Sequence, residues 1–246
     1  MINQGKVLPQ LQSLKAKNQS AFALLVDPDD TDTRKLEQIA RIALETRTGF
    51  IFVGGSLMVD NRMRDCVATL KKETDIPVVL FPGNPNQVVN NADAILFLSL
   101  ISGRNPDLLI GQQVISAPQI IQSGLEVIST GYMIIDGGVP TTVSYMSHSL
   151  PIPANKPDVA LCTAWAGQLM GKHVIYMDAG SGARQPVSDE MIHKVSSHIS
   201  LPLIVGGGIR TPEKVKAVSE AGAQVVVVGN AIEKDITLFK ELVAAL

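Results

Sequence analysis

The 246-residue sequence is poor in cysteine, in excess charge of either sign and in long apolar runs. Its two cysteines, Cys66 and Cys162, show no Cys-x-x-Cys spacing, which argues against a disulfide scaffold and against a thiolate zinc site. The 21 basic and 23 acidic residues leave a formal net charge of -2, too weak a field to hold nucleic acid nonspecifically. No run approaches the roughly 18 to 20 apolar residues that cross a bilayer, and residues 1–20 lack the apolar core of a signal peptide. We therefore expect a cytoplasmic protein with neither a membrane span nor a nucleic acid partner.

Several common catalytic motifs are also missing. The sequence contains no Gly-x-Ser-x-Gly nucleophile elbow, no Walker sequence and no Gly-x-Gly-x-x-Gly after its first apolar β-type run. None of its β-type runs ends in a lysine, which Schiff-base chemistry would need. Hydrolase, ATPase, dinucleotide-binding and Schiff-base functions are accordingly disfavoured.

What the sequence does contain is a regular alternation of short β-branched runs with longer amphipathic segments. This alternation is typical of parallel βα units. The predicted strands are Phe22–Val26, Phe50–Val53, Val78–Phe81, Ala94–Leu98, Gly131–Ile135, Val174–Met177, Leu203–Val205 and Val225–Val228.

Eight units in 246 residues give about 31 residues per unit, which matches the spacing of a (β/α)₈ barrel. We therefore predict an α/β protein with a single TIM-barrel domain over residues 1–246. A doubly wound open sheet shows the same alternation, and periodicity alone does not exclude it. The segment 1–20, with weak helical spacing over Leu8–Lys17, is predicted to close the barrel floor. The Gly/Pro/Ser/Thr-rich segment 136–158 is predicted to be a long βα loop that serves as a lid or an interface.

Glycine-rich turns follow the last three predicted strands. They are Gly180-Ser181-Gly182, Gly206–Gly208 and Gly229-Asn230. Glycines before a helix let backbone N–H groups approach an anion, and TIM barrels commonly bind phosphate after strands seven and eight. An isolated Gly-Gly-Gly would be read as a tight turn. Because three such turns are expected at one end of the barrel, we predict a phosphate-binding site there.

Carboxylates follow the first predicted strand. Asp27 is expected at its tip, where its carboxylate could hold a divalent cation together with the hydroxyl of Ser56 after the second strand. Asp29, Asp30 or Thr31 is expected to cap the helix that begins near Thr33. Magnesium sites typically use one or two protein ligands plus substrate phosphates, so this pair would suffice for a diphosphate substrate.

Seven segments, in order from Leu24 to Asp235, resemble the geranylgeranylglyceryl phosphate synthase family, which includes the PcrB-like prenylglyceryl phosphate synthases, in the branch with bacterial members. The segments are LLVDPDD, FIFVGGS, SLISGRNPDLLIG, DGGVPTTVSYMSHSLPIP, VIYMDAGSGA, PLIVGGGIRTPEK and VVVVGNAIEKD. The resemblance implies a TIM-barrel prenyltransferase of phospholipid biosynthesis that joins sn-glycerol 1-phosphate to a polyprenyl diphosphate, geranylgeranyl by default. The products would be an ether-linked prenylglyceryl phosphate and diphosphate, formed with Mg²⁺ by a homo-oligomer.

The resemblance also implies site residues. Asp27 and Ser56 would contact Mg²⁺, and Asp178 would be the catalytic residue that orients the glycerol hydroxyl and accepts its proton. The glycerol phosphate would lie against Tyr176, Met177, Asp178, Ala179, Gly180, Ser181, Gly182, Gly206, Gly207, Gly208, Gly229 and Asn230. The family usually has glutamate where this chain has Asp178, so the reach of the shorter acid is open to test.

Two alternatives stay open at this point. One is a phosphate-binding TIM-barrel isomerase or synthase of biosynthetic metabolism, which shares the glycine turns. The other is a noncatalytic barrel that binds a phosphorylated metabolite, which glycine turns alone would permit.

Overall fold

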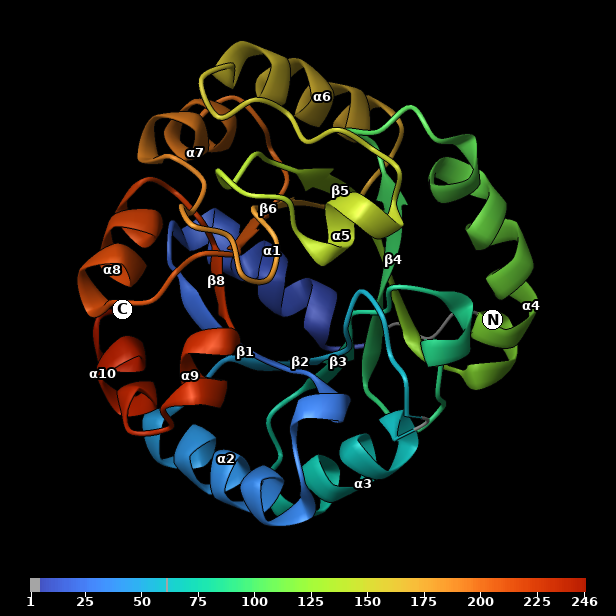
Figure 1. The fold of residues 1–246 in the computed structure, drawn as a ribbon, viewed down its shortest axis with the longest axis vertical. Helices are drawn as coiled ribbons and strands as arrows, with labels where there is room; N and C mark the ends of the chain where they lie inside the picture. Colours follow the sequence, from blue (N-terminus) through green and yellow to red (C-terminus); the bar gives the residue numbers. More distant parts are fainter. Residues whose placement is uncertain (1–4, 61) are drawn as a thin grey trace.

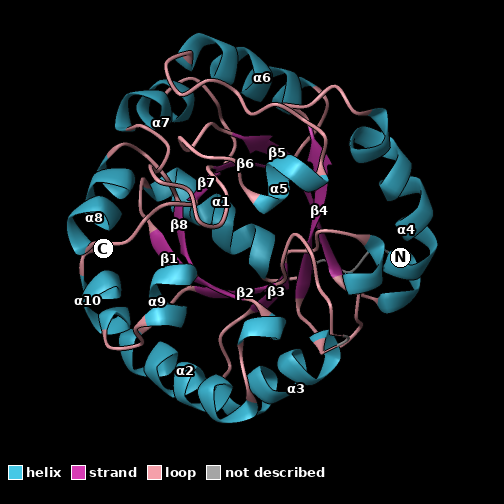
Figure 2. Ribbon diagram, in the orientation of Figure 1, coloured by secondary structure: helices cyan, strands magenta, loops and turns pink. Residues whose placement is uncertain are grey.

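Eight parallel strands pair in chain order and close into a barrel in the computed structural model, which describes residues 5–60 and 62–246. Figure 2 shows the strands in the centre and the helices around them. The closed order, in which β8 pairs with β1, confirms the TIM barrel and excludes an open doubly wound sheet. The strands are β1 (Ala21–Val26), β2 (Phe50–Val53), β3 (Val78–Leu80), β4 (Ala94–Leu100), β5 (Glu126–Ile134), β6 (Val174–Asp178), β7 (Leu203–Gly206) and β8 (Val225–Val228).

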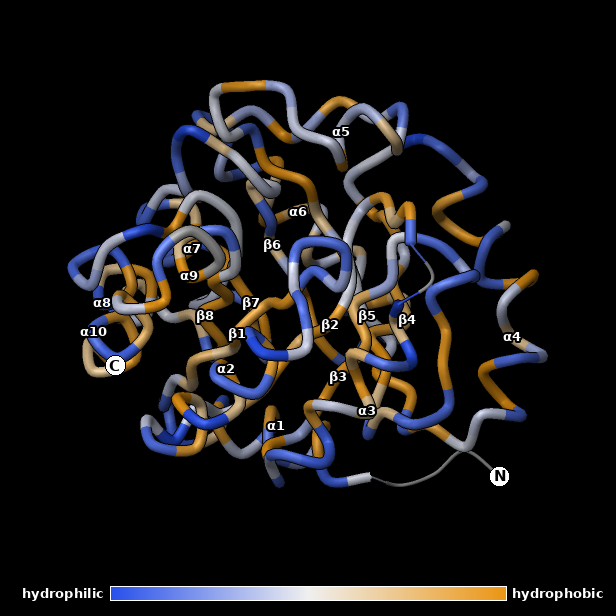
Figure 3. Tube along the Cα trace, turned by 60° about the horizontal axis from the view of Figure 1, so that its bottom comes forward, coloured by the Kyte–Doolittle hydropathy of each residue, from blue (hydrophilic) through white to orange (hydrophobic). Residues whose placement is uncertain are grey.

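Alternate side chains of each strand face the barrel interior and the surrounding helices. In β2, Phe50 and Phe52 belong to the inner core, whereas Ile51 and Val53 belong to the outer core between strands and helices. Because both faces are covered, most strand residues are apolar, as the orange stretches among the strands in Figure 3 show. The period-2 alternation therefore decides which residues of a strand can reach the site inside the barrel.

The helices lie outside the strands or on the barrel ends (Figure 1). The longer ones are α1 (Val7–Lys17), α2 (Thr33–Thr46), α3 (Met63–Glu73), α4 (Gln112–Ser123), α6 (Pro157–Leu169), α7 (Asp189–Ser196), α8 (Pro212–Glu220) and α10 (Leu238–Ala244). Shorter turns are η1 (Pro28–Asp30), η2 (Pro85–Gln87), the π-helical η3 (Asp107–Gly111), α5 (Thr142–Met146) and α9 (Asn230–Lys234). In the described part of the chain, no helix is long and apolar enough to span a bilayer.

The boundaries of two strands differ from the sequence prediction by more than one residue. β5 begins at Glu126, five residues before the predicted Gly131, and β4 continues two residues past the predicted Leu98. Both extensions have one cause, since β4 and β5 pair in register from Ala94–Glu126 to Leu100–Tyr132. A long-range pairing thus draws polar residues into a strand that local composition did not indicate.

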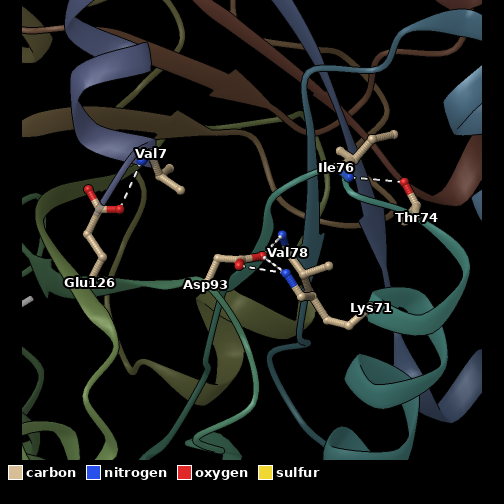
Figure 4. A network of polar contacts seen from close by, with 7 residues as sticks. All are labelled: Val7, Lys71, Thr74, Ile76, Val78, Asp93 and Glu126. Atoms are coloured by element: carbon tan, nitrogen blue, oxygen red, sulfur yellow. Dashed lines mark hydrogen bonds and ion pairs between the residues drawn. The ribbon is translucent and has the colours of Figure 1, made fainter. Parts of the chain in front are cut away.

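The amino ends of the strands form the barrel floor, where α1 lies (Figure 3). The carboxylate of Glu126 accepts hydrogen bonds from the N–H groups of Val7, at 2.9 Å, and Leu8, at 2.7 Å. These are first-turn donors that a helix cannot satisfy internally, and the acid also complements the helix dipole. Figure 4 shows this contact beside a second one, in which Asp93 accepts from the N–H of Val78 and pairs with Lys71. Residues 1–4 of the predicted floor segment lie outside the described residues.

The long segment 136–158 lies at the opposite end of the barrel and contains α5 (Figure 3). It is tied to the strand before it by a bridge between Ile135 and Ile152. Val143 and Met146 of α5 line the interior cavity described below, whereas Tyr145 is 76% exposed. The segment therefore forms a wall of the cavity and also presents apolar side chains outward.

Candidate active site

One cavity of about 570 Å³ lies at the carboxyl ends of the strands. One side of it is polar and is formed by the turns after β1, β2, β6, β7 and β8. The other side is a mostly apolar arm that extends between β4 and α4, where Gln112, Gln113 and Ser116 of α4 also line it. The arm is lined by Val88, Ile95, Phe97, Leu98, Leu108, Ile120, Val143 and Met146, among others. Such a cavity suits an amphiphilic ligand, or a polar ligand beside an apolar one.

Asp178 is the last residue of β6 and faces into the barrel, where only 7% of it is exposed. Its Oδ2 accepts a hydrogen bond from the hydroxyl of Tyr132 at 2.6 Å, and its Oδ1 accepts from the N–H of Gly180 at 2.7 Å. Burial raises the pKa of this carboxyl, while the two hydrogen bonds oppose the rise by stabilising its charged form. A buried, oriented carboxylate with a raised pKa is suited to accept a proton.

Tyr132 was not predicted from the sequence, because only residues after strand ends were considered. It points inward from β5, where register pairs it with Tyr176 of β6. Its ring packs edge-on against Tyr176 at 5.5 Å and near Phe81 at 5.8 Å, and Phe81 and Tyr176 stack at 5.0 Å. The inward position in the strand pattern is the signal that could have identified it.

The predicted phosphate turns come together at the polar end of the cavity. Gly207 and Gly208 have φ angles of +84° and +72°, which side chains rarely adopt. A Cβ on Gly207 would lie 2.6 Å from the backbone nitrogen of Gly180 and 2.7 Å from Oδ1 of Asp178. The hydroxyl of Ser181 donates to Oδ1 of Asn230 at 2.9 Å, which links the turns after β6 and β8. Glycine is therefore required where these backbones converge, and backbone N–H groups brought together in this way are suited to bind a small anion.

The predicted metal residues lie at the same cavity. Asp27 and Ser56 both line it, and Asp30 lies beside them. A Cβ on Gly55 would lie 2.6 Å from Oδ2 of Asp27, so a glycine is needed against this carboxylate. Burial raises the pKa of Asp27, the N–H of Asp29 opposes this rise, and the charges of Asp30 and Asp29 add to it. A bound cation would offset that electrostatic cost.

The carboxylate of Asp27 and the hydroxyl of Ser56 suit Mg²⁺ only when a substrate supplies further oxygen ligands. Among the described residues, no three His, Cys, Asp or Glu side chains form a group that could hold a metal. One carboxylate and one hydroxyl at the cavity wall match the usual Mg²⁺ arrangement, in which substrate phosphates supply further oxygens. The residues present are thus compatible with a magnesium–diphosphate complex.

The helix cap predicted in this region is wrong. Asp32 caps α2, with its carboxylate accepting from the N–H of Lys35 at 2.8 Å. Asp29, one of the predicted caps, instead accepts from the N–H groups of Val59 and Asp60 in the loop after β2. The helix begins after a separate 3₁₀ turn, which shifts the cap by one residue from the nearest candidate, Thr31.

The other predicted substrate residues divide into two groups. Tyr176, Asp178, Ser181, Gly182, Gly207, Gly208, Gly229 and Asn230 line the cavity. Met177 and Ala179 do not: both are buried in the outer core, because they alternate with the inward-facing residues of β6 and its continuation. Gly180 bonds to Asp178, and Gly206 faces the hydroxyl of Tyr176, which a Cβ there would approach to 2.8 Å. These two glycines support the site without lining it.

Comparison with known proteins shows the same architecture and sequence pattern. The model of the PcrB family matches residues 14–246. A protein of Chitinophaga pinensis named geranylgeranylglyceryl phosphate synthase is 54% identical over 98% of this chain and 96% of its own. One of the same name from Spirosoma linguale is 48% identical over 94% and 93%. The crystal structure of (S)-3-O-geranylgeranylglyceryl phosphate synthase from Thermoplasma acidophilum, in complex with its substrate sn-glycerol-1-phosphate, is 32% identical. It superimposes with a TM-score of 0.91 over 98% of each chain.

Proposed function

The chain belongs to the PcrB family, and we infer from this premise that it is a prenyltransferase that joins sn-glycerol 1-phosphate to a polyprenyl diphosphate. The products are an ether-linked prenylglyceryl phosphate and diphosphate. The observation that carries this assignment is that a polar, glycine-lined end and a mostly apolar arm belong to one continuous cavity, which suits both substrates at once. Membership of the PcrB family favours this function over the two alternatives considered from the sequence, the isomerase or synthase and the noncatalytic barrel.

The polar end of the cavity binds the prenyl acceptor, sn-glycerol 1-phosphate. The turns at Gly207-Gly208 and Gly229-Asn230 hold the phosphate of glycerol 1-phosphate, which places its free end near Asp178. The carboxylate of Asp178 orients the terminal hydroxyl and takes its proton as the hydroxyl oxygen bonds to the first carbon of the prenyl chain. The bond from that carbon to the diphosphate oxygen breaks at the same time. Since an allylic carbon readily bears positive charge, orientation of the hydroxyl matters more than a strong base.

The leaving group lies at Asp27 and Ser56. We propose that these two residues hold Mg²⁺ together with oxygens of the diphosphate. When bound, Mg²⁺ supplies positive charge that stabilises the departing diphosphate. The prenyl chain then lies in the apolar arm, where Phe97 and Ile120 exclude water from it. The cytoplasmic location inferred from the sequence stays a prediction.

We propose geranylgeranyl diphosphate as the donor, and a series of labelled prenyl diphosphates of graded chain length tests this. Each is incubated with glycerol 1-phosphate and Mg²⁺ and then extracted into an organic solvent. We expect label in a lipid phosphate, with the highest kcat/KM for the geranylgeranyl donor. Label in lipid with a different optimum would correct the donor alone. Glycerol phosphate binding without any labelled lipid would instead support the noncatalytic barrel.

Replacement of Tyr132 by Phe tests the hydrogen bond to Asp178. The Tyr132 hydroxyl lowers the pKa of the Asp178 carboxyl, so its removal raises that pKa further. Asp178 acts as a base only when ionised, and activity therefore falls as the pH falls through its pKa. We expect the acid limb of the pH profile of kcat/KM to move to higher pH in Tyr132→Phe. An unmoved limb would show that Asp178 does not carry the titration that limits the rate.

We propose that the protein is a homo-oligomer and that the outward face of segment 136–158 contributes to its interface. Tyr145 and Leu150 are exposed apolar side chains in this segment, at 76% and 90%. Tyr145→Ala is expected to lower the assembly state, as measured by native mass spectrometry. Thr142→Ala, in the same short helix, is the control. A monomeric wild-type protein would contradict the proposal.

A further inference from the structure

The turn Gly54–Ser56, which carries the proposed metal ligand Ser56, is enclosed by the loops on both sides of it. Gly54 has a φ of +152°, and a Cβ there would lie 2.0 Å from the carbonyl oxygen of Phe81. Gly83, after β3, would meet the carbonyl oxygens of Gly55 and Ser56 at 2.5 and 2.9 Å if it had a Cβ. The turn is therefore packed backbone to backbone, and its position depends on the polar groups that hold those backbones.

Gln87 holds the turn from the β3 side. Its side chain is buried, with 3% of the residue exposed, and does not line the cavity. Its Nε2 donates to the carbonyl oxygen of Gly55 at 2.8 Å, and its Oε1 accepts from the N–H of Gly83 at 3.0 Å. One side chain thus satisfies a buried backbone group on each of two loops, and this fixes the orientation of the peptide that precedes Ser56.

Asp29 holds the same loop from the β1 side. Its carboxylate accepts from the N–H of Val59 at 2.6 Å and from that of Asp60 at 3.3 Å. Its own N–H donates to Oδ1 of Asp27 at 3.0 Å. The residue therefore connects the carboxylate of Asp27 to the far end of the loop that contains Ser56.

We propose that Gln87 and Asp29 are positioning residues that set the spacing between Asp27 and Ser56 for a divalent cation, although neither lines the cavity. The inference rests on the proposed magnesium site. Mg²⁺ demands near-ideal octahedral geometry, so a site with only two protein ligands is sensitive to their separation. Partners that hold metal ligands in place typically change metal affinity by about 10- to 100-fold when they are removed.

Gln87→Met tests the β3 side, because methionine has a similar length and makes neither hydrogen bond. Binding of Mn²⁺ in the presence of inorganic diphosphate is measured by electron paramagnetic resonance, and binding of sn-glycerol 1-phosphate by calorimetry. We expect Mn²⁺ affinity and the apparent Mg²⁺ affinity in turnover to fall by about tenfold or more. Glycerol phosphate affinity is expected to stay within about twofold, since that ligand lies at other turns. The matched control is Gln224→Met, because Gln224 is also buried and also bridges two backbone groups, the N–H of Leu203 and the carbonyl oxygen of Gly222, away from the cavity.

Asp29→Ala tests the β1 side, because alanine accepts neither hydrogen bond, and it serves as the test if Gln87→Met does not fold. Its control is Asp32→Ala, which removes the same charge and the cap of α2. Asp27→Asn tests the metal site itself. If Asp27→Asn loses Mn²⁺ while Gln87→Met and Asp29→Ala bind it as the wild type does, the positioning role is overturned and the metal site stands. If Asp27→Asn itself binds Mn²⁺ normally, the proposed metal site is wrong.

Discussion

Asp27→Asn is expected to lower kcat by a factor on the order of 10² to 10³ while glycerol 1-phosphate binds nearly as tightly as before. Asp27 serves the departing diphosphate, and a metal that stabilises developing charge contributes several kcal/mol to the transition state. The acceptor phosphate lies instead at the glycine turns after β7 and β8. Steady-state kinetics at saturating Mg²⁺ and calorimetric binding of glycerol phosphate measure the two effects separately.

The asparagine variant is informative because it preserves the local fold. The N–H of Asp29 can still donate to the side-chain oxygen at position 27, as it does to Oδ1 of Asp27. Asp32→Asn serves as the control, since it removes a nearby charge that only caps α2. A near-wild-type kcat in Asp27→Asn would leave Asp27 as the cap of the 3₁₀ turn and would refute its metal role.

Asp178→Asn is expected to lower kcat/KM by about 10²- to 10⁴-fold, the usual range for loss of a general base. Asparagine has nearly the same shape, so its oxygen can accept from the N–H of Gly180 and its amide can donate to the hydroxyl of Tyr132. The 2.7 Å contact with Gly180 is thus kept, and the 2.6 Å contact with Tyr132 reverses its direction, so the variant keeps the shape of the site and loses the basicity. Steady-state kinetics measure the loss, and the thermal midpoint reports whether the fold is intact.

The outcome distinguishes catalysis from a turn-holding role. If Asp178 only holds the Gly180–Gly182 turn, the asparagine variant should keep its activity within a few-fold of the wild type. Asp178→Glu is a second test. Tyr132, Gly180 and Gly207 surround the carboxylate closely, and the extra methylene is therefore expected to cost about 1 to 3 kcal/mol of stability by overpacking. An unchanged thermal midpoint in this variant would show that the pocket has room for the longer acid.

The architecture could be predicted because its determinants are local and repeated. Apolar β-branched runs such as those of β2 and β8 alternate with amphipathic segments, and eight repeats fit one closed barrel. The start of β5 at Glu126 could not be predicted in this way, since it is set by pairing with β4. Local propensity identifies where strands lie, whereas pairing with neighbouring strands sets where they end.

From the residues alone, the site could be predicted where its residues follow a strand directly, whereas Tyr176, within β6, came from the family resemblance. Asp27, Asp178 and the glycine turns were found because the carboxyl ends of barrel strands share one mouth. Tyr132 lies within a strand, where only its inward position marks it, and Gln87 acts through the backbone of another loop, so no sequence motif identifies either residue. Met177 and Ala179 were included because they belong to the same motif, although strand alternation turns both away from the cavity.

The most direct test of the central claim follows an oxygen atom. Glycerol 1-phosphate labelled with ¹⁸O at its terminal hydroxyl is incubated with geranylgeranyl diphosphate, Mg²⁺ and the wild-type protein, and the products are analysed by mass spectrometry. If the hydroxyl held by Asp178 attacks the prenyl carbon, the ether lipid retains the ¹⁸O and the released diphosphate contains none. An ether lipid without ¹⁸O, which would mean that the carbon–oxygen bond of glycerol breaks instead, or no lipid product from both substrates together, would contradict the account.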